Sequence, residues 1–205
     1  MQKSVNLQVN QLYLERGDRD LCQDLTFSVT SGELVRVAGE NGAGKSSLMK
    51  ALLGWLPIES GQIEYKGEDV TVHRDVLLAD QLYLGHTPGI KTVLTPLENL
   101  RLYCPEASLQ ALEQALEHVQ LGPYADIPAA QLSAGQKRRV ALARLWLTDK
   151  PLWLLDEPFT ALDHAGVLAL EAHIKTHLDS GGAVMLTTHQ TLLTLSAKTV
   201  ELAAA

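Results

Sequence analysis

The fold of this chain is decided by one stretch, Gly39-Glu40-Asn41-Gly42-Ala43-Gly44-Lys45-Ser46. A short apolar run at residues 34–38 comes directly before it and is typical of a strand. Residues 45–53 are typical of a helix, which Gly54 ends. A strand, a glycine-rich turn and a helix with the spacing G-x-x-x-x-G-K-[ST] predict a loop that cradles phosphate groups.

Each part of this loop supplies a different element of a phosphate site. The glycines let backbone N–H groups approach an anion, and the helix start adds about half a positive charge. Lys45 adds a full charge that reaches the β- and γ-phosphates, and Ser46 offers a hydroxyl to Mg²⁺. A glycine-rich turn before a chance Lys-Ser is the alternative, which the segments downstream disfavour. The residues expected to bind the nucleotide here are Gly39, Glu40, Asn41, Gly42, Ala43, Gly44, Lys45, Ser46 and Ser47.

An acidic pair follows a fully apolar run at residues 152–155. Such a run is typical of a buried parallel strand, and ligands of open α/β sheets bind at the carboxyl ends of the strands. Asp156 is therefore expected to hold Mg²⁺ through water, together with Ser46. Glu157 is expected to act as general base or to position the attacking water. An ordinary solvated acidic pair is the alternative interpretation.

A histidine ends the last predicted strand, residues 183–187, in the sequence Thr187-Thr188-His189. It is expected at the same edge of the sheet, where it would hydrogen-bond the γ-phosphate and hold the geometry of the water. The predicted catalytic residues are therefore Glu157, His189 and Lys45. Two other histidines, His173 and His177, are four residues apart on a predicted helix, and we expect them on a solvated face.

The chain has 205 residues and is expected to form one α/β domain over residues 1–205. Residues 7–14 alternate between apolar and polar, which predicts a half-buried strand. From residue 96 to about residue 147 the pattern becomes helical. We therefore expect a helical lobe at residues 96–147 and a catalytic core formed by residues 1–85 and 148–205.

The composition excludes several classes of function. The formal net charge is −7 and no run of Lys and Arg is present, so a nucleic-acid partner is not expected. The best apolar stretch, residues 140–147, has eight residues and contains Arg144, whereas a span needs about 20 residues. If the protein works at a membrane, another chain must hold it there. No C-x-x-C-H sequence occurs, so direct haem binding is not expected either.

Between these motifs lies Leu132-Ser133-Ala134-Gly135-Gln136, which resembles the signature of ATP-binding cassette (ABC) proteins, with Ala134 where glycine is usual. The resemblance covers essentially the whole chain. It implies a P-loop NTPase core with an N-terminal antiparallel β subdomain and a helical signature subdomain. It also implies that two copies pair head to tail around two ATP molecules with Mg²⁺. Ser133, Gly135 and Gln136 would then cover the nucleotide of the second copy.

Two positions depart from the pattern of that family. The aromatic residue that usually stacks on adenine falls near Arg16, with Tyr13 three residues earlier. The loop that usually carries a metal-contacting glutamine reads Gly85-His86-Thr87-Pro88, and either His86 or Thr87 takes that place. By the same resemblance, Asp163 orients the partner copy.

Residues 85–92 and Thr187-Thr188-His189-Gln190 resemble a subfamily, the cytochrome c biogenesis (haem exporter) ATP-binding subunits. This resemblance implies a peripheral protein at the cytoplasmic face of the bacterial inner membrane. Its partners would be integral membrane subunits of a cytochrome c maturation complex. ATP hydrolysis would power either haem export or the release of a haem-loaded periplasmic chaperone.

Three alternatives remain open at this point. The chain could energise a different membrane transporter, or it could be a soluble non-transport cassette acting on DNA or ribosomes. It could also be a nucleotide-gated switch with little turnover, which the unusual Arg16 and His86 would favour.

Overall fold

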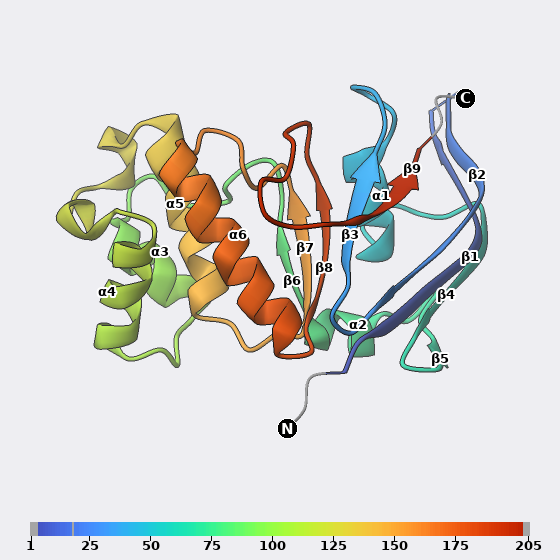
Figure 1. Ribbon diagram of the computed structural model, residues 1–205, viewed down its shortest axis with the longest axis horizontal. Coiled ribbons are helices and arrows are strands. Elements are labelled where there is room, and N and C mark those ends of the chain that lie inside the picture. Colours follow the sequence, from blue (N-terminus) through green and yellow to red (C-terminus); the bar gives the residue numbers. More distant parts are fainter. Residues whose placement is uncertain (1–3, 18, 203–205) are drawn as a thin grey trace. The chain divides into compact units, whose positions relative to one another are not determined.

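The computed structural model describes residues 4–17 and 19–202 (Figure 1). The chain divides into two compact units. The first unit comprises Met1–Tyr83, Lys150–Glu157 and Glu171–Ala205, and the second comprises Leu84–Asp149 and Pro158–Leu170.

The first unit begins with an antiparallel sheet whose strand order is β2-β1-β4-β5. The predicted strand at residues 7–14 is confirmed and is longer than expected. A bulge at Gln11, whose φ is +49°, shifts the alternation by one residue. Because of this shift Leu12 and Leu14 lie in the core with Leu7 and Val9. The strands are β1 (Asn6–Arg16), β2 (Arg19–Thr30), β4 (Ser60–Tyr65) and β5 (Glu68–Asp69).

A second sheet has the strand order β6-β7-β8-β3-β9, and its β7–β8, β8–β3 and β3–β9 pairs are parallel (Figure 1). Every residue of β7 and β8 is buried, as expected for central strands covered on both faces. The register pairs Asp156 with Thr187 at the carboxyl ends of β7 and β8. The strands are β3 (Leu34–Ala38), β6 (Gln81–Leu84), β7 (Leu152–Asp156), β8 (Ala183–Thr187) and β9 (Lys198–Glu201).

Two helices of the first unit follow strands of these sheets. Helix α1 (Lys45–Leu52) begins directly after the glycine-rich loop and ends at Gly54, as predicted. Helix α2 (Asp75–Asp80) is short and leads into β6.

The second unit is helical, and side-chain caps set where its helices begin. Thr95 and Glu98 form a reciprocal capping box around the start of α3, and Ser108 caps α4. Ser133 and Gln136 form a second capping box at α5. The elements are α3 (Pro96–Tyr103), α4 (Leu109–His118), α5 (Ala134–Leu142) and the short 3₁₀ turns η1 (Gly122–Tyr124), η2 (Ala129–Gln131) and η3 (Ala143–Trp146).

Helix α6 (His164–Asp179) corrects one prediction. His177 does not lie on a solvated face, because its side chain is buried and stacks on Trp153 with ring centroids 3.7 Å apart. The cause is helical spacing, since Leu170, Ile174 and His177 lie on the same buried stripe. Of the helices in the described ranges, none combines the length and the apolar character that crossing a membrane requires.

Candidate functional site

The phosphate loop joins β3 to α1 in the first unit, and its backbone depends on glycine. Gly39 has a φ of +148°, and a Cβ atom there would lie 2.8 Å from the carbonyl oxygen of Leu202. Gly44 has a φ of +97° and is the N-cap of α1. Because Gly44 has no side chain to cap the helix, the first N–H groups of α1 are available to an anion.

The ammonium group of Lys45 lies over this loop. Its Nζ donates to the carbonyl oxygen of Gly39 at 2.7 Å and to that of Glu40 at 2.9 Å. The same Nζ lies 3.3 Å from Nε2 of His189. The side chain is almost fully buried, so the positive charge is concentrated at the mouth of the loop.

His189 joins the lysine to the predicted general base. Its Nε2 lies 3.6 Å from Oε1 of Glu157, as well as 3.3 Å from Lys45 Nζ. The three residues come from α1, from the loop after β7 and from the loop after β8. The fold of the first unit therefore brings together the three side chains that the sequence predicted as catalytic. A cation, an imidazole and a carboxylate in this order suit the binding of a terminal phosphate beside an attacking water.

Thr187 is a candidate functional residue that the sequence interpretation missed. Its Oγ1 donates to Oδ1 of Asp156 at 2.7 Å and accepts from the backbone N–H of Glu157 at 2.9 Å. It is fully buried. One hydroxyl thus orients both acidic residues, including Glu157, whose φ of +52° is unusual for a residue with a side chain. The sequence feature that pointed to this residue was the run Thr187-Thr188-His189. The strand register that pairs Thr187 with Asp156 could not be predicted from that run.

The predicted metal ligands are chemically suited to Mg²⁺. Asp156 is buried at the end of β7, and Ser46 is half-buried in the first turn of α1. Both offer hard oxygen donors, which Mg²⁺ prefers over nitrogen. The residues present therefore fit the ion.

The hairpin between β1 and β2 packs against the phosphate loop, which the sequence did not indicate. Leu21 Cβ lies 3.0 Å from the point where a Cβ of Gly44 would be, and Arg19 Nη1 lies 3.8 Å from the corresponding point of Gly42. Arg16 pairs with Arg19 across the hairpin and is exposed. Tyr13 donates through its hydroxyl to Asp20 at 2.7 Å, and this bond, followed by burial, raises the pKa of Tyr13 to about 12.

The signature residues lie in the second unit, at the start of α5. Ser133 Oγ accepts from the N–H of Gln136 at 3.2 Å, and Gln136 Oε1 accepts from the N–H of Ser133 at 2.9 Å. Ser133 is exposed, and its hydroxyl can still donate its proton to a ligand. A Cβ on Gly135 would lie 3.2 Å from the carbonyl oxygen of Ala161. The capping box thus presents a hydroxyl and a helix N-terminus to solvent.

Two arginines of α5 stabilise the neighbouring loops of the same unit. Arg139 Nη2 lies 3.3 Å from Oδ1 of Asp163. Arg138 is buried, and its Nη1 donates to the carbonyl oxygen of Gly85 at 2.5 Å and to that of His86 at 3.5 Å. The side chains of His86 and Thr87 are exposed. Arg138 therefore holds the backbone of the loop at residues 85–88, which by the resemblance described above corresponds to the loop with a metal-contacting glutamine in ABC proteins.

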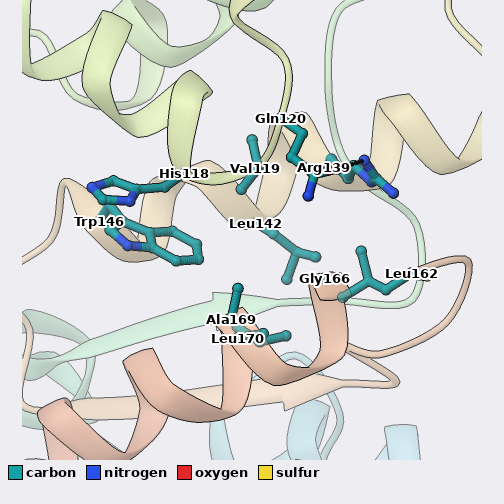
Figure 2. A pocket seen from close by; sticks show the side chains of 10 residues that line it. All are labelled: His118, Val119, Gln120, Arg139, Leu142, Trp146, Leu162, Gly166, Ala169 and Leu170. Carbon is teal, nitrogen blue, oxygen red and sulfur yellow. Dashed lines mark hydrogen bonds between the residues drawn. The ribbon is translucent and has the colours of Figure 1, made fainter. Parts of the chain in front are cut away.

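A pocket in the second unit lies beside Arg139 and Leu162 (Figure 2). His118 and Trp146 stack at one side of it, with ring centroids 5.4 Å apart. Its enclosed space is about 20 Å³, which is room for a single water molecule. It is far too small for a nucleotide.

Comparison with known proteins agrees with this geometry. The family model described as ABC transporter matches residues 22–160. The chain is 48% identical to a Cytochrome c biogenesis ATP-binding export protein CcmA of Tatumella citrea, over 91% of this chain and 89% of that one. It is also 48% identical to the protein of the same name from Vibrio parahaemolyticus, over 94% and 96% of the two chains.

Solved structures show the same fold. One, described as the ATP-binding subunit of an ABC transporter, is 29% identical, with a TM-score of 0.78 over 89% of this chain and 79% of that chain. Another, a bacterial Atm1-family ABC exporter with ATP bound, has a TM-score of 0.81 at 22% identity and covers 93% of this chain and 35% of that chain.

Proposed function

This chain belongs to the ABC transporter family and, within it, to the cytochrome c biogenesis ATP-binding export proteins. We propose that it hydrolyses ATP for a membrane complex of cytochrome c maturation. The observation that carries the proposal is the proximity of the Lys45, His189 and Glu157 side chains at the phosphate loop. These side chains bind the phosphates and activate the water, and the second unit carries the signature residues.

We assign one role to each of the three side chains. Lys45 binds the β- and γ-phosphates and offsets their charge. Glu157 accepts a hydrogen bond from the attacking water and then its proton, while His189 donates to a γ-phosphate oxygen. Water attacks the γ-phosphorus, the bond from that phosphorus to the β,γ-bridging oxygen breaks, and ADP and phosphate leave. Thr187 keeps Asp156 and Glu157 oriented during this step.

Two residues would hold Mg²⁺: Ser46 would bind it directly, and Asp156 would bind it through water. The ion would neutralise charge on the β- and γ-phosphate oxygens. Residues 39–47 would bind the phosphates through their N–H groups.

We propose that a second copy of the chain completes each site. Ser133, Gly135 and Gln136 open an exposed helix N-terminus, which attracts anions. In a head-to-tail pair, this surface of one copy would cover the γ-phosphate bound by the other. Two ATP molecules would then lie at the dimer interface, and Asp163 would orient the partner copy.

Exposed apolar side chains in the first unit suit contact with a partner chain. Trp55 is 62% exposed and stands edge-on to Tyr83, and Val72 is 77% exposed. Arg74 donates through Nε to the carbonyl oxygen of Leu52 at 2.9 Å and through Nη1 to that of Thr71. This tie holds the segment that carries Val72 beside the end of α1. We propose that integral membrane subunits dock here, which would place the chain at the cytoplasmic face of the bacterial inner membrane.

The species that the complex moves is proposed only from the resemblance to the cytochrome c biogenesis subunits. By this resemblance, ATP hydrolysis would power either haem export or the release of a haem-loaded periplasmic chaperone. The relatives' name, an export protein of cytochrome c biogenesis, supports this assignment.

The test uses cells whose own copy of this chain has been deleted. The tagged wild-type chain should restore c-type cytochromes and co-purify with integral membrane proteins after detergent extraction, whereas Glu157→Gln should co-purify but fail to restore the cytochromes. Normal cytochrome levels in the deleted cells would favour a different transporter. Recovery of the chain only on ribosomes or DNA, in a salt-sensitive manner, would favour the soluble alternative.

A further inference from the structure

His189 lies on a segment that has no regular structure. Residues 188–197 connect β8 to β9 without a helix or a strand. More than half of the His189 side chain is exposed, so packing alone does not hold the ring. A side chain on such a segment needs an anchor from a rigid element if its position is to be kept within a fraction of an ångström.

Glu171 of helix α6 supplies an anchor for this segment. Its Oε1 accepts from the backbone N–H of Leu193 at 2.7 Å. Its Oε2 accepts from the backbone N–H of Thr194 at 2.7 Å and from the Thr194 hydroxyl at 2.5 Å. Glu171 is fully buried, although glutamate is seldom buried without partners. Short bonds from N–H and O–H groups to a carboxylate are among the strong ones in proteins.

These bonds bear directly on the position of His189. Leu193 and Thr194 follow His189 by four and five residues. On the other side, the segment begins at Thr187, which the sheet register and a hydrogen bond tie to Asp156. The segment that carries His189 is therefore held at both ends, by the parallel sheet on one side and by α6 on the other.

From this arrangement we infer that Glu171 is a positioning residue for ATP hydrolysis. It holds the segment after β8 so that the His189 ring stays between Lys45 and Glu157. This inference rests on the catalytic role proposed for His189. Glu171 itself touches none of the three side chains proposed as catalytic in the contacts described. It acts through the backbone N–H groups of residues 193 and 194 and through the Thr194 hydroxyl.

The first test is Glu171→Gln. The glutamine has nearly the same shape, but its NH₂ group would face a backbone N–H and leave that donor without an acceptor. We expect kcat for ATP to fall about tenfold through misplacement of His189. The Kd for ATP should stay within about twofold, because the phosphate loop is untouched. Asp179→Asn is the matched control, since Asp179 lies on the same helix and pairs with Lys175 in solvent, and kcat should not change.

A second pair of variants keeps the test decisive if Glu171→Gln does not fold. Thr194→Val removes the hydroxyl that donates to Oε2 but keeps the backbone bond, whereas Thr194→Ser keeps both. Thr194→Val should have a lower kcat than the wild type, whereas Thr194→Ser should keep the wild-type kcat. The Kd for ATP should be unchanged in both variants. Equal turnover in the two variants would overturn the inference.

A double-mutant cycle with His189→Ala separates positioning from mere stability. If Glu171 acts through His189, Glu171→Gln should cost little further turnover once the imidazole is gone. An equal fold-loss in the presence and in the absence of His189 would refute the inference and leave the role of His189 intact. If His189→Ala by itself left kcat unchanged, the proposed role of His189 would fail instead.

Discussion

The hydroxyl of Thr187 donates a hydrogen bond of 2.7 Å to Oδ1 of Asp156 across the β7–β8 ladder. The same oxygen accepts from the N–H of Glu157. The proposed metal ligand, Asp156, and the proposed general base, Glu157, are therefore oriented by one buried group on the neighbouring strand. This group is also two residues before His189, so a single strand end organises both sides of the reaction centre.

Replacement of Thr187 by valine should impair both turnover and stability. The isosteric change removes the hydroxyl that donates to the Asp156 carboxylate and accepts from the Glu157 N–H, whereas the bond from that N–H to the Thr187 carbonyl oxygen remains. The loss of these two buried hydrogen bonds costs about 1–3 kcal/mol in the free energy of unfolding. Urea denaturation measures this cost, and steady-state ATP hydrolysis should show a lower kcat. Thr187→Ser keeps the hydroxyl and should lose much less of both. If valine and serine behaved alike, the hydroxyl would have no orienting role.

Removal of the carboxylate in Glu157→Gln should separate hydrolysis from binding. We expect kcat to fall by roughly 10²–10⁴, the usual contribution of a positioned base, while ATP binding survives. Lys45→Ala should instead weaken ATP binding, because it removes the charge at the mouth of the loop. Titration with a fluorescent ATP analogue and a phosphate-release assay distinguish the two variants. A Glu157→Gln protein as fast as the wild type would remove Glu157 from the mechanism.

The close approach at Gly39 predicts a large effect of one methyl group. In Gly39→Ala the new Cβ would lie 2.8 Å from the backbone oxygen of Leu202, in addition to the strain of a positive φ. An unfavourable backbone region alone costs about 1–3 kcal/mol. We expect Gly39→Ala to lower the free energy of unfolding by well more than this amount. Gly67→Ala is the control, since its φ is +82° and its Cβ would meet nothing within 4 Å. Similar midpoints of urea unfolding for the two variants would contradict the contact.

The bond from Tyr13 to Asp20 makes the stability of the hairpin depend on alkaline pH. The pKa of Tyr13 is raised to about 12 in the folded protein, chiefly by that bond. The unfolded chain loses the phenol proton near pH 10, so between about pH 10 and 12 it binds fewer protons than the folded chain and stability falls as pH rises. The difference in absorbance at 295 nm between the wild type and Tyr13→Phe isolates this tyrosine. Asp20→Ala should move its midpoint down towards 10.

The signature serine should matter only when ATP is bound between two copies. The Glu157→Gln protein with ATP should form a dimer, which light scattering detects, and Ser133→Ala added to it should weaken that dimer. Alanine also removes the cap of α5, a loss of about 1 kcal/mol. Ser133→Asn therefore serves as a second variant, because asparagine caps a helix as well as serine does. A dimer that neither change weakens would argue against contact between Ser133 and the partner's nucleotide.

The phosphate loop, the strand before it and the helix after it, which ends at Gly54, could be predicted because each depends on neighbours in the sequence. Glycine spacing, a strand of apolar residues and a helix terminator are local properties. The residue types of Lys45, Glu157 and His189 also indicated their chemistry, since few side chains can bind a phosphate or take a proton from water.

Other contacts depended on distant parts of the chain. Thr187 reaches Asp156 only through the register of two parallel strands, and Glu171 reaches residues 193 and 194 only because α6 runs beside that segment. His177, expected in solvent, is buried because α6 turns that stripe towards Trp153.

The sequence by itself determined the chemistry of this protein: the loop that cradles phosphate, the acidic pair after an apolar strand and the signature that opens a helix. Only the tertiary structure decided how the side chains proposed for catalysis are held, through the Thr187 hydroxyl and the buried Glu171 carboxylate. The physical reason is that residue type and short spacing set what a group can do. The partner of a buried polar group, in contrast, is chosen by whichever strand or helix packs against it.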